Sequence, residues 1–241
     1  LRDVYNRQKQ GLFKMMKPQP LRIVALLPMK ANSTRVKGKN FRDFCGKPLF
    51  RWILDTLLKI EEIDQVIINT DARPILAEHG LVEDSRIVIR DRKQEICGDD
   101  VSMNLVLADD IANISADLYL MTHTTNPLLT EQTIRKAITM LTSSLIEGTA
   151  DSLFSVNRVQ ARFYRPDGRP VNHDPKNLVP TQDLEPWLEE NSNLYLFSRA
   201  SFATTSARIG SKPLMLETAK HESIDIDTPE DWEFASRVAR L

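Results

Sequence analysis

The sequence predicts an α/β fold built on a mostly parallel sheet. Short apolar runs alternate along the chain with longer segments in which apolar residues recur every three or four positions. The first pattern is typical of buried strands and the second of amphipathic helices. Because they alternate with short links, the pattern indicates βαβ units with parallel strands. A chain of 241 residues, 41% of them hydrophobic, can bury one sizeable core.

Each element can be placed along the chain. The expected strands are 21–27, 65–69, 86–90, 117–121, 152–156 and 193–198. Apolar stripes at helical spacing predict helices over 49–58, 105–112 and 134–145. A last helix is expected from Pro229, since Thr228 and Asp231 have the spacing of a helix cap. Asp71, after the second strand, is expected to cap a further helix.

The alternation stops between residues 158 and 187, where five of the thirteen prolines fall. This composition predicts an irregular insertion in the fold. Residues 1–20 are basic and lack the apolar stretch of a secretory signal. We expect them to form an N-terminal arm or tag-like segment outside the folded domain, which covers 21–241.

Composition excludes several classes of protein. A formal net charge of −1 argues against binding to nucleic acid or to a membrane surface through bulk charge. No apolar stretch approaches the ~20 residues that cross a bilayer. The two cysteines, Cys45 and Cys97, are too few for a disulfide framework and lack metal-ligand spacing. They fit a reducing compartment, so a cytoplasmic location is expected.

The segment that follows the first expected strand is strongly basic. Residues 28–40 read PMKANSTRVKGKN and contain no acidic residue, with cations at Lys30, Arg35, Lys37 and Lys39. Lysine and arginine neutralise phosphate charge, while backbone N–H groups and hydroxyls add directional hydrogen bonds. Open α/β sheets bind ligands at the carboxyl ends of strands. We therefore favour a phosphate-binding loop over a solvated basic loop, although it matches neither the Walker A nor the GxGxxG pattern.

A second group of charges lies near the carboxyl end of the chain. Residues 223–227 read SIDID, a strand-like alternation that places Asp225 and Asp227 on one face. Two carboxylates that converge from one face suit a hard divalent cation. The alternative is a surface position for Asp225 and a purely capping role for Asp231. We adopt that alternative for Asp231 only.

These two motifs resemble the signatures of the acylneuraminate (CMP-sialic acid synthetase) family of cytidylyltransferases. In that family a proline ends the first strand, and Arg-x-x-Ser and then Lys-Asn follow. The residues in register here are Pro28, Ser33, Lys39 and Asn40, with Lys30 in the arginine position. The resemblance covers about residues 21–241. It implies a three-layer nucleotidyltransferase fold, Rossmann-like and GT-A-like, in which Asp225 and Asp227 hold a catalytic Mg²⁺.

Further matches lie between the two motifs. Arg92, Glu95 and Asp99 keep the spacing of a family segment that recognises cytidine. His123 stands where the family has a glutamine that contacts nucleotide or sugar, whereas Leu129 replaces a family arginine. The resemblance implies that the sugar contacts are His123, Thr125, Asn126, Gln182, Asn191 and Tyr195.

The resemblance implies a reaction in which an acidic, sialic-acid-like sugar attacks CTP and releases pyrophosphate. The implied catalytic residues are Lys30, Arg35, Lys39 and Asp227. The implied nucleotide contacts are Pro28, Ser33, Asn40, Arg92 and Asp99. In the resembled family the region that matches the 158–187 insertion is a dimerisation arm that also borders the partner's sugar site, so a homodimer is expected; the alternative is a simple surface excursion.

Two alternatives stay open. One is a nucleotidyltransferase for another sugar, such as Kdo. The other is a catalytically inactive nucleotide-binding relative, for which Lys30 and Leu129 are the signs. The intact pair of Asp225 and Asp227 argues against the inactive relative.

Overall fold

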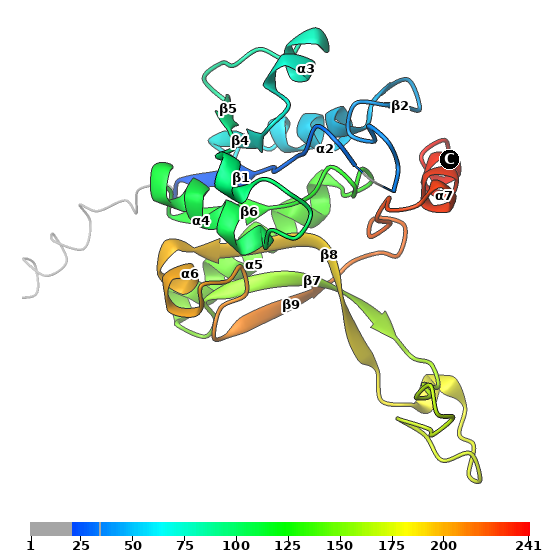
Figure 1. The fold of residues 1–241 in the computed structure, drawn as a ribbon. Coiled ribbons are helices and arrows are strands. Elements are labelled where there is room, and N and C mark those ends of the chain that lie inside the picture. Colours follow the sequence, from blue (N-terminus) through cyan, green and yellow to red (C-terminus); the bar gives the residue numbers. More distant parts are fainter. Residues whose placement is uncertain (1–20, 34) are drawn as a thin grey trace, which may run out of the picture.

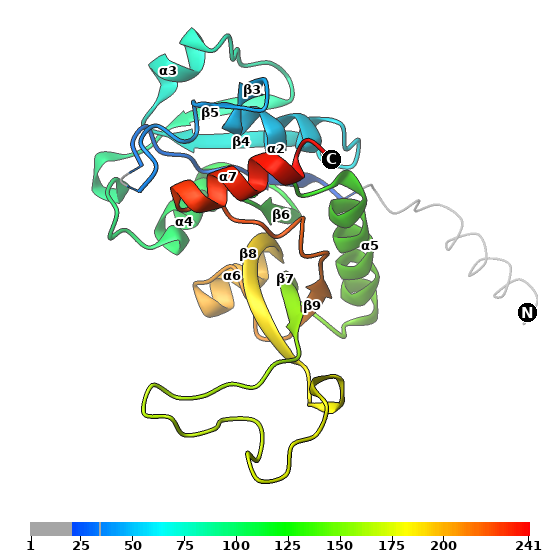
Figure 2. The same cartoon turned by 90° about the vertical axis from the view of Figure 1, so that its right-hand side faces the viewer.

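The structure is a computed structural model that describes residues 21–33 and 35–241, so the predicted arm 1–20 lies outside the described residues. The described chain forms a seven-stranded sheet in the order β5-β4-β1-β6-β8-β7-β9. Helices lie on both faces of the sheet, as Figures 1 and 2 show from two sides. The predicted α/β class with three layers is therefore confirmed.

The strands of the main sheet are β1 (Ile23–Leu26), β4 (Gln65–Thr70), β5 (Ile87–Asp91), β6 (Leu118–Met121), β7 (Ser152–Val159), β8 (Trp187–Ser198) and β9 (Pro213–Glu217). A separate two-stranded hairpin consists of β2 (Asp43–Phe44) and β3 (Lys47–Pro48). Only β8 runs against the other strands of the main sheet, since both of its pairings are antiparallel and all others are parallel. The sheet is therefore mostly parallel, as predicted.

The α-helices are α2 (Leu49–Leu58), α3 (Arg73–Glu78), α4 (Met103–Asn113), α5 (Glu131–Glu147), α6 (Arg199–Thr205) and α7 (Pro229–Val238). Two 3-10 turns, η1 (Gln94–Ile96) and η2 (Thr181–Asp183), complete the regular elements. The four longer helices are those that the sequence predicts. No helix among the described residues is long and apolar enough to cross a membrane.

Strand β1 contributes side chains to two hydrophobic cores, one on each face of the sheet. Ile23 and Ala25 face a layer formed by α2 and α5, whereas Val24 and Leu26 face a layer formed by α4 and α6. All four side chains are at most 4% exposed. A strand buried on both faces needs a continuous apolar run, and that is the pattern found in the sequence.

The carboxyl-terminal helix is capped as predicted, but the preceding segment is not a strand. Thr228 and Asp231 form a reciprocal capping box, with Pro229 in the first turn of α7. Residues 223–227 lie outside every strand; instead the Ile226 N–H donates to the Thr125 carbonyl at 2.8 Å. The strand-like alternation of this segment does not make it a strand of the sheet; Ile224 and Ile226 pack with residues of α7, while Asp225 and Asp227 line the cleft described below.

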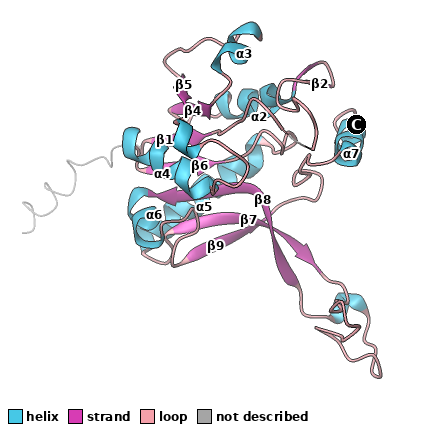
Figure 3. Ribbon diagram, viewed as in Figure 1, coloured by secondary structure: helices cyan, strands magenta, loops and turns pink. Residues whose placement is uncertain are grey.

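The 158–187 insertion is the far end of a long hairpin. Strands β7 and β8 continue beyond the body of the molecule, and the chain between them is mostly loop (Figures 1 and 3). Within it, Phe163 and Trp187 stack with ring centroids 4.9 Å apart. The pairing of β7 with β8 shifts register between Phe154 and Val156, so residues 191–194 form a bulge in β8. This bulge lies next to the site described below.

Candidate functional site

A cleft of about 410 Å³ lies at the carboxyl edge of the parallel strands. The segments that follow β1, β5 and β6 all contribute to it, because parallel strands end at the same edge of a sheet. The β8 bulge also reaches this edge, since β8 runs in the opposite direction. Of the predicted site residues, those that line the cleft are Pro28, Lys30, Ser33, Arg35, Lys39, Asn40, Arg92, Asp99, His123, Thr125, Asp225 and Asp227.

The basic loop after β1 is held in place by hydrogen bonds to the Asn40 and Asp71 side chains. The Asn40 amide donates to the Lys30 carbonyl at 2.9 Å, and its oxygen accepts from the Thr124 hydroxyl at 2.6 Å. The Ala31 N–H donates to the Asp71 carboxylate at 2.7 Å. The capping role predicted for Asp71 is therefore wrong: the N-cap position of α3 is occupied by Ala72, which provides no side-chain cap. Asp71 fixes the loop instead.

The two predicted motifs meet at one carboxylate. Asp227 forms ion pairs with Lys39 and with Arg35, each at 3.0 Å. The Lys39 ammonium also donates to the Ile226 carbonyl at 2.7 Å, and Lys39 is only 8% exposed. Residues nearly 190 positions apart thus form one charged cluster. Hydrogen bonds to ionised groups are strong, so the Asp227 carboxylate orients the Lys39 and Arg35 side chains toward the cleft.

Asp225 differs from Asp227 in its surroundings. Its Oδ1 atom is buried and has no hydrogen-bond partner among the described residues. Burial raises the pKa of its carboxyl group, the Thr125 hydroxyl opposes that rise, and the charge of Asp227 adds to it. An unpartnered buried carboxylate oxygen is costly, so the cleft offers a position where a cation would be stabilised.

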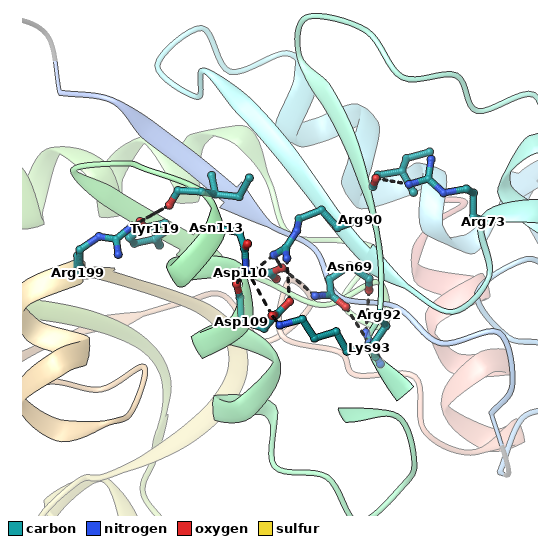
Figure 4. A network of polar contacts seen from close by, with 12 residues as sticks. Asn69, Arg73, Arg90, Arg92, Lys93, Asp109, Asp110, Asn113, Tyr119 and Arg199 are labelled. Atoms are coloured by element: carbon teal, nitrogen blue, oxygen red, sulfur yellow. Dashed lines mark hydrogen bonds and ion pairs between the residues drawn. The ribbon is translucent and has the colours of Figure 1, made fainter. Parts of the chain in front are cut away.

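Arg92 is anchored by its neighbours rather than exposed. Its guanidinium donates to the Asn69 side chain at 2.9 Å and to the Asn69 and Met29 carbonyls at 2.7 and 3.2 Å. The Asn69 amide in turn donates to Asp110, which pairs with Arg90 (Figure 4). Burial lowers the pKa of Arg92 and raises that of Asp110 to about 6. This network fixes the plane of the Arg92 guanidinium at the edge of the cleft.

Lys30 links the loop to the segment after β5. Its ammonium donates to the Gly98 carbonyl at 2.7 Å and pairs with the Asp99 carboxylate at 3.0 Å. Gly98 has a φ of 120°, which only glycine adopts without strain. The two predicted nucleotide-binding segments therefore close over the same side of the cleft.

His123 lies among positive charges. Burial, together with the nearby charges of Arg208 and Lys39, lowers its pKa to about 4. The imidazole is therefore neutral near pH 7 and can donate or accept a hydrogen bond there. It is poorly suited to act as a general base at that pH.

Four predicted sugar contacts do not line the cleft of their own chain. Asn126 is fully buried and donates to the Ile224 carbonyl at 3.4 Å. Asn191 bonds Ser155, Asn157, Thr218 and the Asn193 N–H, which secures the β8 bulge. Gln182 lies in the 158–187 insertion. Tyr195 is buried beneath the cleft, with its hydroxyl bonded to Glu190.

Sequence reasoning missed other residues that line the cleft: Met29, Asn32, Met103, Thr124, Ser192 and Arg208. Ser192 has a φ of 56°, a left-handed conformation rare for serine, at the centre of the bulge. Arg208 lies between α6 and β9, where a single arginine in a loop carries no signal in the sequence. Leu129, in contrast, is 2% exposed and packs in the core, away from the cleft.

Comparison with known proteins gives a consistent family. The family model described as Cytidylyltransferase matches residues 24–240. The CMP-N,N'-diacetyllegionaminic acid synthase of Legionella pneumophila is 27% identical, covering 92% of this chain and 97% of that protein. The N-acylneuraminate cytidylyltransferase of Oncorhynchus mykiss is 26% identical over 91% of this chain, which spans 51% of that protein.

Among solved structures, a CMP:2-keto-3-deoxy-manno-octonic acid synthetase in complex with CTP has a similar fold. The TM-score is 0.65 at 14% sequence identity, and the match covers 91% of this chain and 98% of that one. This similarity supports the architecture described above.

Proposed function

The chain belongs to the cytidylyltransferase family, whose members are nucleotidyltransferases, and on that premise we propose that it transfers the cytidylyl group of CTP to an acidic sugar of the nonulosonic, sialic-acid-like class. The observation that carries the proposal is the cluster in which Lys39 and Arg35 meet Asp227 in the cleft. The two relatives named for legionaminic acid and for N-acylneuraminate support an acidic acceptor.

In this proposal the nucleotide lies on the β1 and β5 side of the cleft. Arg92, held by Asn69, presents a fixed hydrogen-bond donor to the cytosine and ribose. Lys30 and Asp99 close the same side, and Pro28, Ser33 and Asn40 shape the loop that receives the triphosphate. Both the free nucleotide and the transition state are strongly anionic, so fixed cations stabilise the reacting phosphates.

The reaction that fits this arrangement is an in-line displacement. The sugar hydroxyl oxygen bonds to the α-phosphorus of CTP, the bond from that phosphorus to its bridging oxygen breaks, and pyrophosphate leaves. The hydroxyl proton is released to solvent. Lys39 and Arg35 hold the β- and γ-phosphates, and the sugar lies beside His123 and Thr125. Catalysis then depends mainly on positioning and charge stabilisation.

We propose Mg²⁺ as the ion of this site, held by Asp225 and Asp227. The residues present fit it, because Asp225 has a buried carboxylate oxygen without a partner among the described residues. No cluster of three or more His, Cys, Asp or Glu side chains suited to a metal lies in 21–33 or 35–241. Mg²⁺ commonly takes one or two carboxylates and completes its shell with substrate phosphates and water. When bound, it neutralises charge on the phosphates.

Nucleotide choice provides the first test. If Arg92 reads cytosine, CTP with Mg²⁺ is expected to raise the melting temperature by several degrees more than ATP, GTP or UTP at equal concentration. A ligand at 100 times its Kd stabilises the folded state by about 2.7 kcal/mol. Differential scanning fluorimetry measures this shift. Equal shifts from all four nucleotides would leave a general triphosphate site and remove the cytidylyl assignment.

We further propose that the arm formed by the 158–187 insertion joins two copies of the chain. Six large apolar side chains that are at least 39% exposed lie along this arm and at its base: Tyr164, Val171, Leu178, Val179, Trp187 and Leu188. Apolar side chains grouped on a projecting segment mark an interaction surface, and two-fold dimers are the commonest closed assembly. Gln182, which is remote from the cleft of its own chain, would then border that of the second copy.

The dimer is expected to appear in light scattering as twice the chain mass of 27.5 kDa at micromolar concentration. Leu178→Asp, on the arm, should shift the protein toward the monomer because it buries a charge in the contact. Ile146→Asp is the matched control, since Ile146 is also exposed but lies on α5. A monomeric wild type, or equal effects from both variants, would rule out the arm as the contact.

A further inference from the structure

Arg208 lies on the β8 side of the cleft, away from the residues assigned to the nucleotide. Its guanidinium contacts Met121 at the end of β6 and Tyr195 on β8. The Arg92 guanidinium, in contrast, donates to the Met29 carbonyl after β1 and to the Asn69 carbonyl on β4. In the sheet order β5-β4-β1-β6-β8 the two guanidinium groups therefore lie over different strands, with Arg208 on the β8 side.

The Arg208 guanidinium is partly buried and forms one long ion pair but no hydrogen bond to an anion. Its side chain is 20% exposed. Across the described residues its hydrogen bonds include no oxygen acceptor; its one contact of this type is the Met121 sulfur at 3.8 Å. Arg208 forms an ion pair with Glu190 at 3.6 Å, which is too long for a hydrogen bond, and the same Glu190 oxygen accepts from the Tyr195 hydroxyl. The guanidinium N–H groups therefore have no oxygen acceptor among the described residues, so they remain available to an incoming anion.

The orientation of this guanidinium is also fixed. It lies over the Tyr195 ring at 3.8 Å from the centroid, and that ring is fully buried. A cation over an aromatic face is stabilised and keeps its plane. A planar guanidinium held in this way presents two parallel N–H donors, the geometry that binds a carboxylate in a bidentate manner. Ser192, on the bulge, and His123 add neutral polar groups to the same end of the cleft.

We propose that Arg208 binds the carboxylate of the acceptor sugar and thereby selects acidic over neutral sugars. This inference rests on the proposed function. The triphosphate has its own cations in Lys30, Arg35 and Lys39, so Arg208 remains for the second anionic group of the reaction. Bound there, the carboxylate anchors the sugar at the β8 end while its hydroxyl faces the α-phosphate.

The test compares an acid with its methyl ester, which lacks the negative charge. Pyrophosphate release is measured for N,N'-diacetyllegionaminic acid, N-acetylneuraminic acid and Kdo, each with its ester, in the wild type and in Arg208→Gln. We expect the variant to raise KM for the acid about 50-fold and KM for CTP less than threefold. The wild type should prefer the acid over the ester by a similar factor, and the variant should lose that preference. Arg208→Lys should restore the preference only in part, because lysine lacks the planar fork.

Arg199→Gln is the matched control. Arg199 begins α6, and its guanidinium bonds the Ile114 carbonyl and the Tyr119 hydroxyl instead of the cleft. It should leave both KM values unchanged. If the wild type turns over an acid but Arg208→Gln keeps its KM, or raises KM for CTP instead, this inference fails and the proposed function stands. If the wild type turns over none of the three acids, the proposed function fails, and the inference fails with it.

Discussion

Asp227→Asn is expected to reduce turnover with CTP by about two orders of magnitude or more, the scale of losing a main electrostatic stabiliser. The Asp227 carboxylate orders Lys39 and Arg35, each at 3.0 Å, and it is one of the two proposed Mg²⁺ ligands. An amide keeps the shape but has no charge, so it weakens both functions. Steady-state pyrophosphate release at saturating CTP measures the loss.

Asp231→Asn is the control for this change. Asp231 is four residues away and caps α7 through Thr228, so its loss should cost about 1 kcal/mol or less of stability and leave turnover nearly intact. Asp227→Asn should itself remain folded, since it removes no buried apolar volume. Near-normal activity of Asp227→Asn would show that the metal assignment is wrong and that Asp225 or another group holds the ion.

Lys39→Met is expected to lower kcat/KM for CTP by about 100-fold. Lys39 is 8% exposed, and its ammonium joins the basic loop to the 225–227 segment through the Ile226 carbonyl and Asp227. Methionine keeps much of the volume but removes the charge and both hydrogen bonds. A fixed cation that acts on phosphate in a partly desolvated site contributes on this scale. Initial-rate kinetics at varied CTP concentration measure the effect.

Lys37→Met separates a specific role from bulk charge. Lys37 belongs to the same loop and is exposed, but it does not line the cleft. It should change kcat/KM less than threefold at physiological salt, where exposed charges are screened. If both variants lose activity equally, the loop acts through its overall charge, and the assignment of Lys39 is contradicted.

Much of the fold is predictable from local pattern, and the misses have physical reasons. Strands such as β1 and β4 are buried on both faces and read as apolar runs. Strand β9 is not among the predicted strands, because only Leu216 of its five residues is buried. Helices α3 and α6 have six and seven residues, too few to show a helical period. The start of β8 is exposed along the arm, so its pattern gives no sign of a strand.

The site divides in the same way. The basic loop is one continuous stretch of sequence, and the Asp225–Asp227 pair is another. The chemistry of each can therefore be recognised without a structure. Ser192 and Arg208 reach the cleft only because a bulge in β8 and the loop after α6 bring them there. The position of Asp71 after a strand is typical of a helix cap, but tertiary packing directs its carboxylate to the Ala31 N–H. Mg²⁺, the dimer and the cytoplasmic location stay predictions.

The most direct test of the central claim is pyrophosphate release from CTP and Mg²⁺ with N,N'-diacetyllegionaminic acid, N-acetylneuraminic acid and Kdo supplied one at a time. We expect N,N'-diacetyllegionaminic acid, N-acetylneuraminic acid or both to yield pyrophosphate and the corresponding CMP-sugar in equal amounts. No pyrophosphate should be released when the sugar is omitted. Release with Kdo alone would move the acceptor to that sugar class. Binding of CTP without release for any of the three acids would contradict the account and indicate a catalytically inactive relative.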